Sequence, residues 1–205
     1  RIIPGEYKDM DGQWTGVGPL WDEKTIQGKR KSFGPSTYAS QILQDPASAE
    51  KKRLQREDLR RWDNSDLKNL NLYILSDPAG ERKKGSDNSA LAVVGYGADD
   101  NYYLVDMVRR QMGQLERKDQ IFHWVKKYEI QVSLIEAHGK DSEILFIEDY
   151  QDREHFHFPI VKIADPTPKN DRIADFIDLC KGGRFFFPHE IPHVNTEGEQ
   201  EDLME

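Results

Sequence analysis

Hydrophobic and polar positions alternate in short, regular segments in the later part of the chain. Three apolar segments, at residues 71–76, 89–96 and 102–108, are separated by short polar stretches. Residues 97–101, Gly-Ala-Asp-Asp-Asn, are typical of a hairpin turn between the second and third segments. This pattern predicts three consecutive strands that pair antiparallel.

Helical and strand patterns then follow one another. Residues 114–128 carry apolar side chains at the spacing of an amphipathic helix. Two more helices are predicted at 141–152 and 170–179, and a Gly-Gly pair shortly after the second suits a helix C-terminus. The remaining apolar segments predict three further strands: residues 131–136, 159–163 and 184–188. A strand reached through a helical crossover usually runs parallel to its partner, so the fold class is α/β, with a mixed sheet flanked by helices.

Residues 1–69 differ from the rest of the chain. They are rich in glycine and proline and contain few long apolar runs. The highly charged stretch at 51–62 is typical of a solvated surface or a linker, with a DNA contact as the alternative. We therefore predict a connector over residues 1–69 and one compact domain over residues 70–205.

Composition excludes several classes of protein. The formal net charge of −8 argues against a general nucleic-acid coat protein, but not against a nuclease that holds cations. Cys180 is the single cysteine, which excludes an internal disulfide or a cysteine-based zinc site and favours a buried structural thiol. No apolar run approaches the roughly 20 residues that span a bilayer. No secretory signal is visible either, so we expect a reducing, cytoplasmic setting without membrane contact. The sequence contains no P-loop motif, which argues against a P-loop ATPase in these residues, and no Gly-x-Ser-x-Gly elbow.

Two of the predicted strands end in a carboxylate. Asp77 follows the strand at 71–76, and Glu136 closes the strand at 131–136. If these strands are neighbours, both acids lie at the carboxyl edge of the sheet, where open α/β sheets hold ligands. Carboxylates suit Mg²⁺ or Mn²⁺, and two such ions about 4 Å apart can promote phosphodiester hydrolysis. We predict Asp77 and Glu136 as catalytic metal ligands; the alternative for Asp77 is a role in the turn before Pro78.

Other acidic residues are weaker candidates. Asp87 precedes the second strand and is a candidate metal ligand, although Asp-Asn after Gly-Ser is also ordinary turn chemistry. Asp171 opens the predicted helix at 170–179, where it either caps the helix or serves as a late catalytic acid. Asp106 lies within the third strand and is expected to face solvent or to pair with Arg109.

Basic residues near these acids are candidate contacts to DNA phosphates. One group forms the turn after the first strand, for which a solvated hairpin tip is the alternative. The other group flanks Asp171. The candidate DNA-binding residues are Arg82, Lys83, Lys84, Lys169 and Arg172.

Several segments, taken in their order along the chain, resemble the nuclease domain of the large terminase subunits of tailed bacteriophages. They include Leu-Ser-Asp-Pro-Ala around Asp77 and Ile-Glu-Ala-His-Gly around Glu136. The likeness covers most of the chain. The segments are residues 38–46, 75–79, 85–90, 103–106, 135–139, 169–173 and 183–188.

This resemblance implies a ribonuclease H-like fold, with three antiparallel strands followed by parallel ones. It also implies a metal-dependent endonuclease that cleaves concatemeric double-stranded DNA with two Mg²⁺ or Mn²⁺ ions during viral genome packaging. By the same resemblance, residues 1–69 are the connector from an upstream ATPase domain. The expected partners are double-stranded DNA, a portal protein and a small terminase subunit, in the host cytoplasm. Asp77 matches the first family acid and Glu136 the second; the third lies in a His-Asp-Asp-like segment past residue 205, or Asp171 replaces it.

Three alternatives remain open from the sequence. One is another ribonuclease H-like nuclease, such as a junction resolvase or an integrase-like enzyme. Another is a fragment of an actin-like sugar kinase, whose first strand also ends in aspartate, although its expected Asp-x-Gly-Thr sequence is absent. The last is a binding module that kept the fold without the activity.

Overall fold

The computed structural model describes residues 5–33, 38–44, 54–65, 67–78, 88–136, 142–164 and 166–204. The chain divides into two compact units. The first unit combines Arg1–Arg60 with Thr167–Phe185, and the second combines Arg61–Pro166 with Phe186–Glu205.

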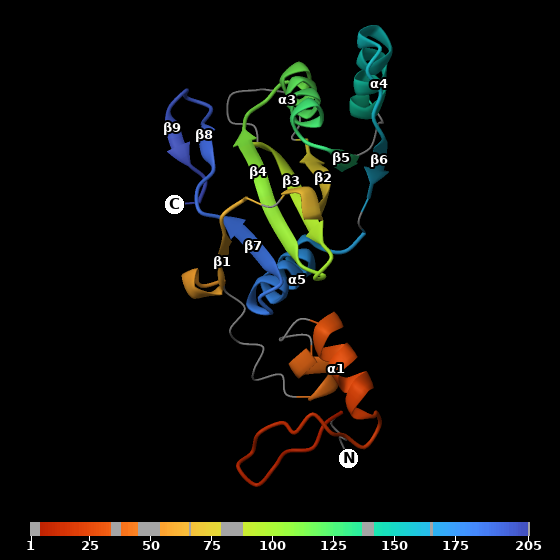
Figure 1. The fold of residues 1–205 in the computed structure, drawn as a ribbon, viewed down its shortest axis with the longest axis vertical. Coiled ribbons are helices and arrows are strands. Elements are labelled where there is room, and N and C mark those ends of the chain that lie inside the picture. The colour runs from red at the N-terminus through yellow and green to blue at the C-terminus, as the bar shows by residue number, and fades with distance from the viewer. Residues whose placement is uncertain are drawn as a thin grey trace. The chain divides into compact units, whose positions relative to one another are not determined.

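A seven-stranded sheet dominates the fold, in the order β1-β7-β4-β3-β2-β5-β6 (Figure 1). β2 pairs antiparallel with β3, and β3 with β4, whereas β2 and β5 run parallel, as do β5 and β6. The mixed sheet predicted from the sequence is therefore confirmed. The strands are β1 Arg60–Trp62, β2 Leu70–Asp77, β3 Ser89–Gly97, β4 Tyr102–Arg110, β5 Ile130–Glu136, β6 Ile160–Ile163 and β7 Phe185–Pro188.

One face of this sheet carries the main hydrophobic core. The helices α3 (Gln114–Lys127) and α4 (Ser142–Glu154) pack on it, as the periodicity predicted. Burial alternates strictly along β3, as expected for a strand with one face against the core. The buried side chains include Leu72, Ile74, Leu91, Val93, Val108, Ile121, Phe122, Trp124, Ile135 and Ile147.

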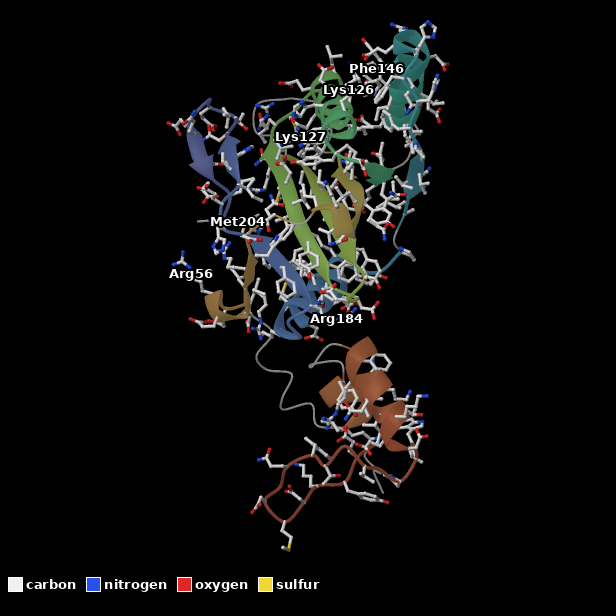
Figure 2. The ribbon with its side chains drawn as sticks, viewed as in Figure 1. Arg56, Lys126, Lys127, Phe146, Arg184 and Met204 are labelled. Carbon is white, nitrogen blue, oxygen red and sulfur yellow. The ribbon has the colours of Figure 1, made fainter. Side chains whose placement is uncertain are left out.

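A single carboxylate fastens α3 to this face. The Trp124 indole, the Lys127 ammonium and the Tyr128 hydroxyl donate to Asp106 Oδ2 at 3.1, 3.2 and 2.9 Å. Burial raises the pKa of Tyr128, and the carboxylate beside it raises that pKa further. Figure 2 shows Lys127 in the basic last turn of α3. The expectation that Asp106 faces solvent or pairs with Arg109 is therefore wrong, because residues three apart in a strand point to opposite faces.

A buried ion pair joins α3 to the first turn of α4. Arg117 Nε and Nη2 donate to the two carboxylate oxygens of Glu143 at 2.8 and 2.6 Å. A third donor, Arg117 Nη1, binds the Met112 carbonyl oxygen at 2.7 Å. The two charged side chains are only 7% and 10% exposed, so the pair is largely removed from water.

The first unit contains a small cluster around a buried glutamate. Asp22 caps the N-terminus of α1 (Glu23–Ser32) by accepting from Thr25 N at 2.9 Å. Glu6 is fully buried and receives two hydrogen bonds from Arg30, at 3.0 and 2.6 Å, and another from the Tyr38 hydroxyl. The same unit contains α5 (Lys169–Lys181), which confirms the last predicted helix.

A two-stranded hairpin, β8 (Pro192–Val194) and β9 (Gln200–Asp202), follows β7. The apolar pattern of the sequence predicts no strand over these residues. The hairpin attaches to the end of β4: the buried His193 ring nitrogen Nε2 lies 2.9 Å from the Arg109 carbonyl oxygen. The Thr196 hydroxyl also accepts from Gln111 N at 3.0 Å. In the part of the chain described here, no helix has the length and apolarity to cross a bilayer.

Candidate active site

Asp77 and Glu136 are the last residues of two neighbouring parallel strands. β2 and β5 lie side by side, and their register pairs Leu75 with Leu134 and Ser76 with Ile135. Each carboxylate comes directly after the last of these pairs. Because adjacent strands are about 4.8 Å apart, the backbones of the two acids are about 5 Å apart as well.

Both acids lie on the same face of the sheet. Leu75 and Leu134 are directly paired, and Asp77 and Glu136 follow two residues later in their strands. Side chains two apart in a strand share a face, so the two carboxylates project to the same side. Ser76 points to the other side and is buried in the core. The acids therefore lie on the face opposite to α3 and α4, where Asp77 is exposed and Glu136 half-buried.

This donor set suits a hard divalent cation. Two carboxylates on adjacent rigid strands offer oxygen ligands of the kind that Mg²⁺ and Mn²⁺ prefer. Within the described ranges, no group of three or more Asp, Glu, His or Cys side chains is placed to hold a metal. The predicted ligand Asp87 and the basic turn residues Arg82, Lys83 and Lys84 lie outside the described residues. Their roles remain predictions.

The remaining candidates lie on α5, in the first unit. Asp171 is the third residue of this helix, is exposed, and its backbone N–H binds the Pro168 carbonyl oxygen at 2.9 Å. A carboxylate in the first turn also favours the helix dipole. Lys169 is exposed and Arg172 is half-buried in the same turn. Their proposed parts in catalysis and DNA binding stay predictions.

The sheet register aligns one further residue with the two acids, Arg109, which the sequence pattern does not indicate. Asp77 pairs with Ala90 of β3, and Ala90 pairs with Arg109 of β4. Glu136, Asp77, Ala90 and Arg109 thus form a row across four adjacent strands on one face. The sequence contains no signal for this alignment, because it depends on two strand registers at once.

The family model described as the terminase RNaseH-like domain matches residues 74–201, which include both acids. The chain belongs to this family. The ribonuclease H-like fold and the suggested terminase relationship are thereby confirmed, and the match runs from within β2 to within β9.

Solved structures resemble the terminase domain described here at low sequence identity. The large terminase of the thermophilic bacteriophage D6E, in complex with ADP, is 9% identical with a TM-score of 0.48, over 74% of this chain and 40% of that one. The chain thus spans less than half of that large terminase. The large terminase nuclease of thermophilic phage G20c with bound magnesium is 12% identical with a TM-score of 0.45, over 71% and 83% of the two chains. The fowlpox virus Holliday junction resolvase is 14% identical with a TM-score of 0.33, over 53% and 72%. No curated protein matches.

Proposed function

We propose that this chain is the nuclease domain of a DNA-packaging terminase and cleaves double-stranded DNA with the help of divalent cations. One observation carries the proposal: Asp77 and Glu136 end neighbouring parallel strands in register and share a face. Membership of the terminase RNaseH-like family supports the same activity. The structure of the G20c terminase nuclease with bound magnesium, and a second one with cobalt, supports the choice of metal.

The two carboxylates would bind the cations from the surface of the sheet, where the strand backbone is rigid. β2 lies between β3 and β5 in the sheet, so hydrogen bonds on both sides fix the backbone that carries Asp77. The buried core under β2 and β5 holds Ser76 and Ile135, the residues just before the acids. Two bound Mg²⁺ or Mn²⁺ ions would supply an activated water and stabilise charge on the leaving oxygen. The protein's contribution is to place the two ligands side by side on neighbouring strands.

The proposed activity requires further residues besides these two acids. We propose that Asp171 or a later residue provides the third acid, and that Asp87 adds a metal ligand. Lys169, Arg172 and the basic turn at Arg82, Lys83 and Lys84 would contact the DNA backbone. Cleavage of concatemeric DNA, with a portal protein and a small terminase subunit in the host cytoplasm, follows from the terminase resemblance.

A plasmid-nicking assay tests this proposal. The chain is incubated with supercoiled plasmid and Mn²⁺, beside the variants Asp77→Asn and Glu136→Gln. We expect cleavage by the unmodified chain and a loss of more than about 100-fold in each variant, because each removes one charged ligand. The matched control is Glu148→Gln, which removes an exposed carboxylate from α4 on the other side of the sheet. Cleavage by Asp77→Asn at the rate of the control contradicts the proposal.

A further inference from the structure

The row Glu136–Asp77–Ala90–Arg109 ends in a basic side chain on the same face as the acids. Two strand spacings of about 4.8 Å separate Asp77 from Arg109 along this row, or roughly 10 Å between their backbones. Alanine is the smallest side chain that a strand can place between them. The single methyl group of Ala90 does not extend into the space between the carboxylates and the arginine.

The Arg109 guanidinium is available for a ligand. Arg109 is exposed, and its backbone carbonyl is occupied by His193. Among the described residues, its guanidinium takes part in no hydrogen bond or ion pair. Other arginines of the same unit are engaged in the fold: Arg117 binds Glu143, and Arg153 pairs with Asp149 at 2.6 Å.

The Arg109 side chain lines a polar cleft of about 490 Å³ beside this row. One wall comes from residues around the start of β3 and the end of β4, and the other from the β8–β9 hairpin. The lining residues are Asn88, Arg109, Gln111, Asn195, Thr196, Glu197 and Glu201. The hydrogen bonds of His193 and Thr196 to the backbone of residues 109 and 111 fix both walls relative to each other.

We propose that Arg109 binds a DNA phosphate within a few nucleotides of the scissile one, and that the cleft takes the adjoining backbone. This inference rests on the proposed nuclease function. A guanidinium binds phosphate through two parallel hydrogen bonds, and amide and hydroxyl groups such as those of Asn88 and Thr196 add neutral contacts. Phosphates of one strand follow one another at about 3.4 Å along the helix axis. The spacing of roughly 10 Å therefore places the two phosphates within a few nucleotides of each other.

The acidic residues of the hairpin wall limit the length of DNA backbone that the cleft can bind. Glu197 is exposed, and Glu201 Oε1 lies 3.7 Å from His193 Nε2. Carboxylates repel phosphate, so the attraction is centred on Arg109. For the same reason Glu197→Gln is expected to tighten DNA binding.

The test measures affinity for a short DNA duplex by fluorescence anisotropy across a series of salt concentrations, with the full chain and without cleavage-supporting metal. Loss of one phosphate contact makes the negative slope of log K against log salt less steep by about 0.9. At about 50 mM salt it weakens binding on the order of tenfold. We expect this result for Arg109→Gln and a slope close to that of the unmodified chain for Arg109→Lys, which keeps the charge. The matched control is Arg153→Gln, an exposed arginine of α4, with an unchanged slope.

An unchanged slope in a folded Arg109→Gln variant overturns the inference, and so does an equal loss in Arg153→Gln. Thermal melting of each variant shows whether it is folded. The affinity measurement does not depend on Asp77, because Asp77 is not proposed to contact a phosphate directly. Each of the two proposals can therefore be overturned without the other. Persistent cleavage by Asp77→Asn overturns the nuclease site, whereas a flat response to Arg109→Gln overturns only the phosphate site.

Discussion

Replacement of Glu143 by leucine is expected to destabilise the second unit strongly. Glu143 accepts two hydrogen bonds from Arg117, whose side chain is only 7% exposed. Glu143→Leu leaves the guanidinium buried without its counter-ion, while its third hydrogen bond to Met112 keeps it in place. Breaking a buried ion pair on one side costs about 3–5 kcal/mol. For a chain of this size, this corresponds to a fall in Tm of about 6–20 °C, at about 2–4 °C per kcal/mol.

The assay is urea unfolding followed by tryptophan fluorescence. Trp124 is 2% exposed and lies on the same helix as Arg117, so its emission reports on the packing of α3. The companion variant Arg117→Met/Glu143→Leu removes both charges and leaves only the Met112 carbonyl without its donor. We expect it to lie within about 2 kcal/mol of the unmodified chain, because apolar replacement of a buried pair is often nearly neutral.

Two outcomes refute this reasoning. A loss below about 1 kcal/mol in Glu143→Leu shows that the pair behaves like one on the surface. The second outcome concerns the losses in unfolding free energy. If the loss in the double variant equals the sum of the losses in Arg117→Met and Glu143→Leu, the two side chains do not act as a pair.

Two further predictions concern the first unit. Burial favours the neutral form of Glu6, but hydrogen bonds from Arg30, Tyr38 and Gly16 outweigh it and lower the pKa of Glu6. A lowered pKa in the folded state contributes stability that is present above the unfolded value near 4.3 and is lost as the pH falls through the folded value. Glu6→Gln should therefore cost about 2 kcal/mol at pH 7 and less at pH 3 in denaturant melts; an equal cost at both pH values contradicts this. Burial raises the pKa of the Cys180 thiol to about 11, so a thiol reagent at pH 8 should label it only after unfolding, and rapid labelling of the folded chain contradicts its burial.

The sheet could be predicted from the sequence because its main strands alternate or cluster their apolar residues over several positions. The central strands β2, β3 and β4 and the helix α3 lie within a few residues of their expected limits. The short strands could not be predicted. β1, β8 and β9 have three residues each, which is too short to show a periodicity that separates a strand from a loop.

The candidate site could be predicted only in part from the sequence, for a different reason. Asp77 and Glu136 could be found because each ends an apolar strand, which is a local signal. Arg109 became a candidate only through the registers of β2 with β3 and of β3 with β4. The hydrogen bond from Trp124 to Asp106 became visible only through the packing of α3 on the sheet. Such relations come from tertiary pairing and leave no trace in the neighbouring sequence.

The most direct test of the account is the position of a bound metal. In crystals grown with Mn²⁺, anomalous scattering locates the ion without reference to activity. We expect a peak between the carboxylates of Asp77 and Glu136, on the sheet face opposite to α3 and α4, and no such peak in Asp77→Asn. An ion located elsewhere contradicts the proposed metal site, and so does a structure in which the two carboxylates lie on opposite faces of the sheet.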